Sequence, residues 1–186
     1  FNKNQVVAVV MGGPSAEREV SLNTGAAIAN ALREYGYTNV VEIDLDPRNF
    51  GKQLAESKAE VVFNAVHGLY GEDGRLQTLL EIREMPYTGS GMIASVSCMD
   101  KVITKRMLRD AGISTPACLI VNKKESGIKE KIMQRFSLPV VIKPASQGSS
   151  IGVEIVKEEN QLDEALANAF KYSRDILVEE FIGGKE

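Results

Sequence analysis

The sequence contains few of the residues that cross-link small proteins or bind zinc. Its 186 residues include two cysteines, one histidine and no tryptophan. Cys98 and Cys118 form no Cys-x-x-Cys pair, and a single histidine nearly excludes a zinc site built from Cys and His ligands. We therefore expect both thiols to be small core residues in a reducing compartment, and we expect a cytoplasmic protein.

Long apolar runs and an excess of one charge are also missing. The longest apolar run, from Val6 to Met11, is far shorter than the roughly 20 residues that cross a bilayer. No basic stretch followed by an apolar run opens the chain, so we expect no signal peptide. The formal charge of −3 gives no basic footprint for nucleic acid. We therefore expect neither a membrane nor a nucleic acid as partner.

Strand and helix patterns alternate in the first half of the chain. Each apolar run ends in a loop that contains glycine or proline, which is typical of buried parallel strands. The expected strands are residues 5–11, 40–45 and 61–66, and the expected helices are residues 17 or 21 to 35 and residues 74–83, the latter with Asp73 as N-cap. Such alternation predicts a parallel sheet, in which ligands bind at the carboxyl ends of the strands.

The second half has a different pattern. A loop rich in Thr, Gly and Ser, residues 87–91, is the candidate boundary, and we place the two domains at 1–96 and 97–186. The later elements expected are helices at 99–111, 123–135 and 158–172, and extended segments at 115–121, 138–143, 151–156 and 176–181. We therefore predict an α/β chain, with a parallel-sheet, Rossmann-like domain followed by an α+β domain whose strands are antiparallel around a Gly-Ser loop.

Two segments of the second half suit a nucleotide. Residues 143–152 place small residues and hydroxyl groups after Lys143, so that backbone N–H groups can approach phosphate oxygens. The spacing is not that of a Walker A loop, and a flexible hairpin turn explains the composition equally simply. Residues 178–186 combine a strand edge with Gly-Gly, which can read an adenine ring through backbone groups or be an ordinary strand and turn.

Two segments of the first half suit a small polar ligand. In residues 67–74, His67 follows a strand among three glycines, which can bring its ring and the loop backbone close to a ligand. The ring can act as a donor or proton carrier, or simply bond to its own loop. In residues 12–19, Glu17 follows a Gly-Gly pair and can bind an ammonium group. A glutamate near a helix start is also favoured by the helix dipole, so both interpretations of Glu17 stay open.

In order and spacing, these segments together resemble the D-alanine–D-alanine ligase family of ATP-grasp enzymes. The matching segments are residues 12–22, 67–74, 86–91, 99–101, 143–152 and 179–182. The resemblance implies that the second domain is an ATP-grasp subdomain. It also implies ATP-dependent ligation of two D-alanine molecules through a D-alanyl phosphate, for peptidoglycan synthesis. The cofactors it implies are ATP and, in the complete enzyme, Mg²⁺ or Mn²⁺. The assembly it implies is a homodimer formed through the first domain.

The resemblance also implies roles for particular residues. Glu17 would hold the ammonium group of the first D-alanine, Ser149 would join Glu17 in a hydrogen-bonded network, and both count as catalytic. His67 would contact the first D-alanine and its acyl phosphate. The residues implied to bind ATP are Lys101, Lys143, Gln147, Gly148, Ser149, Ser150, Glu179, Glu180, Ile182 and, through the ribose, Glu186.

The chain departs from the family pattern at Glu186, before the C-terminal part of the grasp. That part holds the family's metal-binding carboxylates, so we expect no metal site in this chain and no ligation by this chain alone. One alternative is a non-catalytic fragment that binds ligand or dimerises. Another is a related ligase that takes D-lactate or D-serine as its second substrate.

Overall fold

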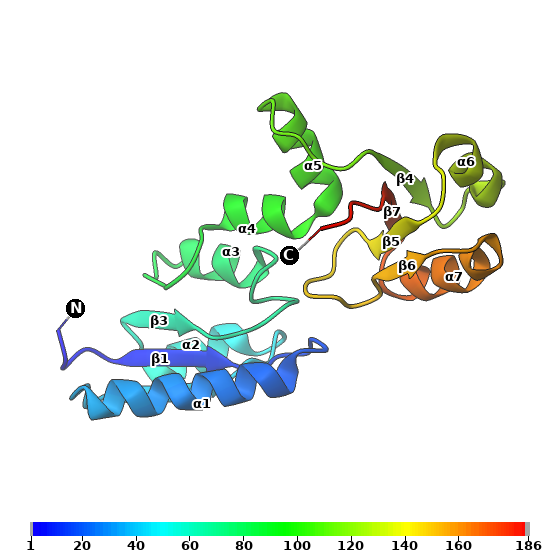
Figure 1. The fold of residues 1–186 in the computed structure, drawn as a ribbon. Helices are drawn as coiled ribbons and strands as arrows, with labels where there is room; N and C mark the ends of the chain where they lie inside the picture. Colours follow the sequence, from blue (N-terminus) through cyan, green and yellow to red (C-terminus); the bar gives the residue numbers. More distant parts are fainter. Residues whose placement is uncertain (1, 185–186) are drawn as a thin grey trace. The chain divides into compact units, whose positions relative to one another are not determined.

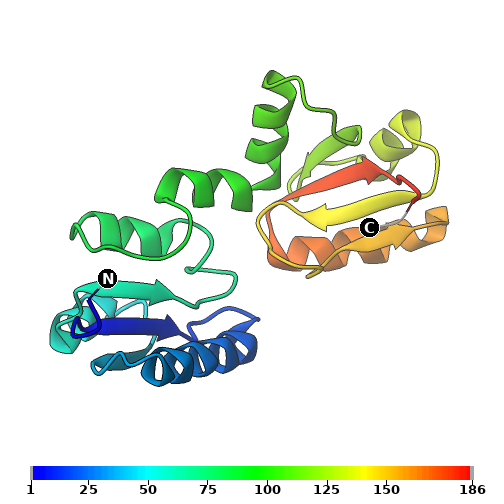
Figure 2. The ribbon, with the colours of Figure 1, turned by 60° about the vertical axis from the view of Figure 1, so that its left-hand side comes forward.

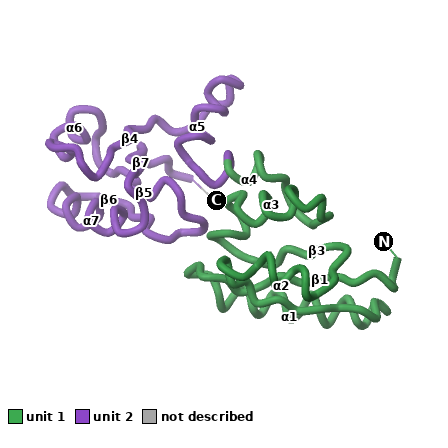
Figure 3. Tube along the Cα trace, turned by 180° about the vertical axis from the view of Figure 1, so that it is seen from behind, with its two compact units in different colours: residues 1–96 green, residues 97–186 purple. Residues whose placement is uncertain are grey.

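The computed structural model describes residues 2–184 and divides into two compact units. Unit 1 is Phe1–Val96 and unit 2 is Ser97–Glu186 (Figure 3). Each unit has a sheet and a hydrophobic core of its own. One sheet is parallel and the other antiparallel, which confirms the predicted α/β class.

Unit 1 has three layers, and the middle one is a parallel sheet of strand order β2-β1-β3 with helices on both faces (Figure 1). Its elements are β1 (Val7–Met11), α1 (Arg18–Glu34), β2 (Val40–Asp44), α2 (Phe50–Ser57), β3 (Val61–Asn64) and α3 (Arg75–Glu81). The helix α4 (Met92–Met99) crosses the boundary between the units. All five residues of β1 are buried because helices cover both faces of the sheet.

The two faces of β1 belong to two different clusters of apolar side chains. Val9 and Met11 pack with residues of α1, whereas Ala8 and Val10 pack with residues of α2 and α3. The strand therefore reads as a continuous apolar run, and its carboxyl end meets the loop that contains Gly12.

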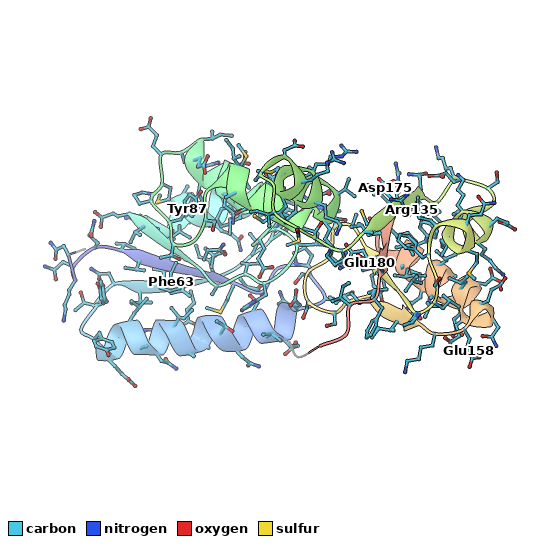
Figure 4. All side chains as sticks on the ribbon, turned by 45° about the horizontal axis from the view of Figure 1, so that its top comes forward. Phe63, Tyr87, Arg135, Glu158, Asp175 and Glu180 are labelled. Atoms are coloured by element: carbon cyan, nitrogen blue, oxygen red, sulfur yellow. The ribbon has the colours of Figure 1, made fainter. Side chains whose placement is uncertain are left out.

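The segment that follows α3 extends the sheet beyond β3. The Val62 N–H donates to the Pro86 carbonyl at 2.8 Å, and the Thr88 N–H donates to the Val62 carbonyl at 3.0 Å. Phe63 and Tyr87 are labelled on this part of unit 1 in Figure 4. The Tyr87 hydroxyl donates to Glu81 at 2.6 Å. Burial and the Glu81 charge raise the pKa of Tyr87 to about 12, so the segment keeps this bond at neutral pH.

Unit 2 is an antiparallel sheet of order β4-β7-β5-β6 (Figure 2). Its elements are α5 (Lys101–Asp110), β4 (Cys118–Asn122), α6 (Ile128–Arg135), β5 (Val140–Pro144), β6 (Glu154–Val156), the 3₁₀ helix η1 (Glu159–Gln161), α7 (Leu162–Tyr172) and β7 (Asp175–Glu180). Alternate residues of the strands pack with α6 and α7 to form the core. The other face of the sheet carries Lys143 and Glu179, because each lies one residue away from a core position.

Three expectations about helices were wrong. The short helix α2 was missed, because within its eight residues only Phe50 and Leu54 are buried and this gives a weak pattern. The helix α4 was also missed; it ends at Met99, and the helix expected at 99–111 is present as α5, which begins after Asp100, whose carboxylate caps it by accepting the N–H groups of Val102 and Ile103. The helix expected from residue 123 begins at Ile128, after a turn.

Two smaller expectations were also wrong. The N-cap of α3 is Gly74, which has a φ of +87°, and not Asp73. Asp73 instead joins the preceding loop to the start of α3, because its carboxylate accepts the N–H groups of Tyr70 and Arg75. The thiols are not core residues either, since Cys98 is exposed and Cys118 is partly buried.

Candidate functional site

The loops after β1 and β3 carry Glu17 and His67. Glu17 is the N-cap residue of α1 and, within residues 2–184, its side chain makes no capping hydrogen bond. A Cβ atom built on Gly68 would lie 2.7 Å from Glu17 Oε2, so the carboxylate rests against the loop that begins at His67. The structure thus brings these two candidate residues to the same edge of unit 1, at the carboxyl ends of neighbouring strands.

The His67 ring has partners and also an open side. Its Nε2 lies 3.3 Å from Thr24 Oγ1, and its Nδ1 lies 3.7 Å from Glu72 Oε1. About one third of the side chain is exposed (34 %). The ring is therefore held in place by its own unit and still presents surface to a ligand.

Two serine hydroxyls join the loops after β1 and β3. Ser21 Oγ is fully buried, accepts the Gly12 N–H at 2.8 Å and donates to the Ala65 carbonyl at 2.7 Å. Ser15 Oγ repeats the arrangement: it accepts the Glu17 N–H at 3.1 Å and donates to the His67 carbonyl at 2.7 Å. Ser15 therefore links the backbones of both candidate substrate-binding residues through one atom.

Replacing Ser15 by alanine should loosen this edge of unit 1. The Glu17 N–H and the His67 carbonyl would each lose a hydrogen bond, which is expected to destabilise unit 1 by about 1–2 kcal/mol. Urea unfolding followed by amide hydrogen exchange measures the change and its location.

Ser57→Ala is the matched control. Ser57 Oγ also accepts one N–H and donates to one carbonyl, but both partners lie within three residues of it. Amide exchange at residues 15–17 and 65–68 should quicken in the Ser15 variant and stay unchanged in the control. Equal exchange in both variants would contradict the linking role of Ser15.

An ion pair supports the same loop from β2. Arg18 donates to both carboxylate oxygens of Asp44, at 2.7 and 2.6 Å, and its Nη1 also lies 3.3 Å from the Gly13 carbonyl. The Arg18 guanidinium lowers the pKa of Asp44, so the pair is present throughout the neutral range. The pair therefore fixes Arg18, which directly follows Glu17, and Arg18 in turn holds the Gly13 carbonyl at the start of the loop.

In unit 2, three lysines gather around one buried carboxylate. Glu179 on β7 is 4 % exposed. Its Oε1 lies 2.8 Å from Lys105 Nζ, and its Oε2 pairs with Lys143 Nζ from β5. Burial lowers the pKa of Lys101, and the positive charge of nearby Lys143 lowers it further. The cluster carries three positive charges and one negative charge, which suits a polyphosphate.

The glycine-rich loop after β5 is attached to this cluster. Lys101 Nζ donates to the Gln147 carbonyl, and the Lys101 N–H donates to the Ala145 carbonyl at 2.9 Å. Beyond Gln147 and Gly148, the loop exposes Ser149 and Ser150. Two of the predicted phosphate-binding lysines and the predicted loop therefore come together within unit 2.

The end of β7 carries the residues that the resemblance assigns to adenine. Glu180 and Asp175 mark the two ends of this strand in Figure 4. Glu180 accepts the Ala117 N–H at 2.7 Å, and Ile182 is exposed. The Glu179 side chain points instead to the lysines. Glu186 lies outside the described residues.

An apolar surface adjoins the lysine cluster on the same face of the sheet. Val141 lies opposite Glu179 on β7 and opposite Ile155 on β6, so the three side chains share one face. Ile155 is half exposed (49 %). An apolar surface next to ammonium groups matches the two halves of a nucleotide, a flat base and a polyphosphate.

Some residues of these sites were missed in the sequence. Ser15 and Ser21 act through partners far along the chain, so no local pattern marks them. Lys105 had a usable signal, because it lies four residues after Lys101 and residues at this spacing share one face of a helix. The predicted network of Ser149 with Glu17 joins residues of different units, and it stays a prediction.

A hollow of about 210 Å³ opens at the other end of the unit 1 sheet. It is lined by Val7, Leu32, Tyr37, Val61, Val62, Phe63 and Thr88, and so lies away from Glu17 and His67.

Within residues 2–184, no three His, Cys, Asp or Glu side chains are grouped to hold a metal ion. In the same range, no helix combines the length and the apolar character needed to cross a membrane.

Comparisons with known proteins agree with this geometry. Sequence models of the D-ala D-ala ligase N-terminus and C-terminus match residues 46–90 and 107–186, and together they cover more than half of the chain. A D-alanine–D-alanine ligase from Moorella thermoacetica is 48 % identical over 97 % of this chain and 59 % of its own length.

Solved structures give the same result. A crystal structure of a D-alanine–D-alanine ligase from Bacillus anthracis is 35 % identical, with a TM-score of 0.83 over 97 % of this chain and 58 % of that chain. A structure of the Bacillus anthracis ligase complexed with ATP is 34 % identical, with a TM-score of 0.84 over 97 % of this chain and 60 % of that chain. The chain thus spans somewhat less than two thirds of the length of these relatives.

The two units together define an α/β protein of the ATP-grasp type, in which a parallel-sheet domain is followed by an antiparallel one. Within that class, the chain belongs to the D-alanine–D-alanine ligase family. The family suggested by the motifs is therefore confirmed.

Proposed function

We propose that this chain supplies the first-substrate and nucleotide sites of an ATP-dependent ligase that joins two D-alanine molecules for peptidoglycan synthesis. The observation that carries the proposal is the cluster of Lys101, Lys105 and Lys143 around Glu179, beside the glycine-rich loop. Ammonium groups and loop N–H groups neutralise phosphate charge, which is the main task in phosphoryl transfer. The ATP bound to a similar ligase from Bacillus anthracis supports ATP as the nucleotide.

In this proposal, unit 1 binds the first D-alanine. Glu17 pairs with its ammonium group, and His67 contacts its carboxylate and the acyl phosphate that forms there. Two features support these roles: the Glu17 carboxylate makes no capping bond within the described residues, and the His67 ring is partly exposed. The shared Ser15 hydroxyl favours one fixed geometry for both residues, and fixed geometry is what positioning requires.

The proposed reaction has two steps. A carboxylate oxygen of the first D-alanine attacks the γ-phosphorus of ATP, and ADP leaves. The ammonium group of the second D-alanine loses one proton to solvent. The resulting amine attacks the acyl carbon, and phosphate leaves and takes up the second proton as the peptide bond forms. Lys101, Lys143 and the residues 147–150 hold the phosphates.

The described residues do not fit a magnesium or manganese site, because no three ligating side chains are grouped among residues 2–184. We also propose a homodimer formed through unit 1 and a cytoplasmic location, which the family membership supports.

D-alanine-dependent release of phosphate from ATP tests the proposal, measured on the complete product of the gene that encodes this chain. We expect D-alanine, and not L-alanine, to stimulate release. Glu17→Gln should lower kcat/KM for D-alanine about a hundredfold, since a charged contact to the ammonium group is lost. Glu19→Gln, an exposed acid two residues along, is the matched control and should be neutral. Phosphate release that ignores D-alanine would overturn the function.

A further inference from the structure

The carboxylate of Glu179 is shared between two ammonium groups. Lys105 Nζ lies 2.8 Å from one oxygen, and Lys143 Nζ pairs with the other. The exposed fractions of the three side chains are 6 % for Glu179, 13 % for Lys105 and 25 % for Lys143. Glu179 and Lys105 are thus nearly withdrawn from water, whereas Lys143 is the partner that solvent and ligands reach.

Lys105 is held in place independently of Glu179. Its Nζ donates a second hydrogen bond, at 2.8 Å, to the Pro116 carbonyl just before β4. Its helix α5 begins at the Asp100 cap, and the Lys101 N–H ties the same turn to Ala145. Lys105 therefore presents a fixed positive charge, whereas Lys143 is the more exposed of the two lysines that pair with Glu179.

A phosphate group that binds Lys143 competes with Glu179 for it. If Lys143 were the only partner, its departure would leave a buried carboxylate unpaired, and an unpaired buried charge is strongly unfavourable. With Lys105 in place, Glu179 keeps one ammonium partner and one charge-assisted hydrogen bond when Lys143 leaves.

We infer that Lys105 is a positioning residue of the nucleotide site, which keeps Glu179 paired and thereby frees Lys143 to bind phosphate. The inference rests on the nucleotide site of the proposed function. Lys105 acts through Glu179 and is not assigned a contact with the nucleotide.

A double-mutant cycle tests this coupling. The dissociation constant of ATP is measured by titration calorimetry for the wild-type chain, Lys105→Met, Glu179→Gln and the double variant. We expect Lys105→Met to weaken ATP binding about tenfold in the wild-type background and to have no effect when Glu179 is already Gln. If Lys105 contributed only a long-range positive charge, the same loss would appear in both backgrounds, and the inference would fall.

Two further variants separate positioning from loss of structure. Lys105→Arg should restore ATP binding, because a guanidinium can also pair with a carboxylate. Lys129→Met is the matched control, since Lys129 pairs with Asp163 at the same 2.8 Å but on the surface. Adenosine, which has no phosphate, should bind the wild type and Lys105→Met equally, whereas a damaged fold would weaken both ligands.

A measurement without ligand keeps the test independent of the proposed function. Nitrogen-15 NMR of lysine ammonium groups reports how fast their protons exchange with water. In Lys105→Met, the Lys143 protons should exchange several-fold more slowly, because Glu179 then holds Lys143 alone. Unchanged exchange would overturn the inference. Absence of ATP binding by the wild type, with the exchange effect present, would instead overturn the nucleotide site and leave the pairing established.

Discussion

Replacing Gly71 by alanine is expected to destabilise unit 1 by about 3–5 kcal/mol. A Cβ atom at this position would lie 2.0 Å from the Val66 carbonyl oxygen, so the backbone itself must move. Overpacking of this kind costs about 1–3 kcal/mol. Moving Gly71 also breaks the hydrogen bonds that its carbonyl accepts from Asn64 and Gln77, at about 1 kcal/mol each.

The change should also reach the candidate substrate site. Gly71 lies in the loop of residues 67–74, so its movement displaces His67 relative to Glu17. Urea unfolding measures the loss of stability, and amide hydrogen exchange should show it in β1 and β3 and not in β5 or β7, because each unit has its own core.

Gly91→Ala is the matched control for this prediction. Neither glycine has a positive φ, and the nearest atom to a Cβ on Gly91 is Glu81 Oε1 at 3.7 Å, which is ordinary contact. Gly91→Ala should therefore change the free energy of unfolding by less than about 0.5 kcal/mol. If the two variants unfolded alike, the close approach at Gly71 would not be a determinant of stability.

Gly71 also illustrates what the sequence could and could not predict. The glycines of residues 67–74 predicted a loop at the end of a strand, and that loop is there. From the sequence, we attributed the glycines to close approach of a ligand. The structure adds a different constraint, since at Gly71 the chain approaches its own backbone, and such a contact between residues 66 and 71 depends on the loop's full path.

The strands were predicted well because each leaves a local pattern. The apolar runs from residue 5 and residue 61 and the pair around the glycine-rich loop all form strands close to the predicted bounds. The short helices α2 and α4 left little pattern, because few of their residues are buried. Boundaries set by one cap, such as Asp100, depend on a single side chain and were misplaced.

The residues of the candidate sites also divide into those that a local pattern marks and those that only the fold reveals. Residues within motifs, such as Lys143 and the loop after it, could be named because the motif is local. Ser15 could not be assigned a role in this way, because it joins segments that only the fold brings together: its hydroxyl meets residue 67. Lys105 was marked only by its spacing from Lys101, and its pairing with residue 179 also depends on the fold.

The second large effect is expected for Glu179→Gln, which should destabilise unit 2 by about 3 kcal/mol. The substitution keeps the shape of the side chain but removes the one negative charge between Lys105 and Lys143. Removing one partner of a buried ion pair costs about 3–5 kcal/mol, and the partial exposure of Lys143 places the value at the lower end.

The effect should depend on salt, which identifies its cause. The two lysines and Lys101 would repel one another, and added NaCl screens repulsion between partly exposed charges. Urea unfolding at low and at high NaCl should therefore show a smaller loss at high salt, with faster amide exchange in β5 and β7.

Asp163→Asn is the matched control for Glu179→Gln. It also removes a carboxylate that pairs with a lysine at 2.8 Å, but the side chain of Asp163 is 74 % exposed. Exposed pairs contribute about 0–1 kcal/mol, so this variant should unfold almost as the wild type does. A loss for Glu179→Gln no larger than for Asp163→Asn would show that the lysines do not need Glu179. The same carboxylate would then be free to take another part in the nucleotide site, such as a contact with the base.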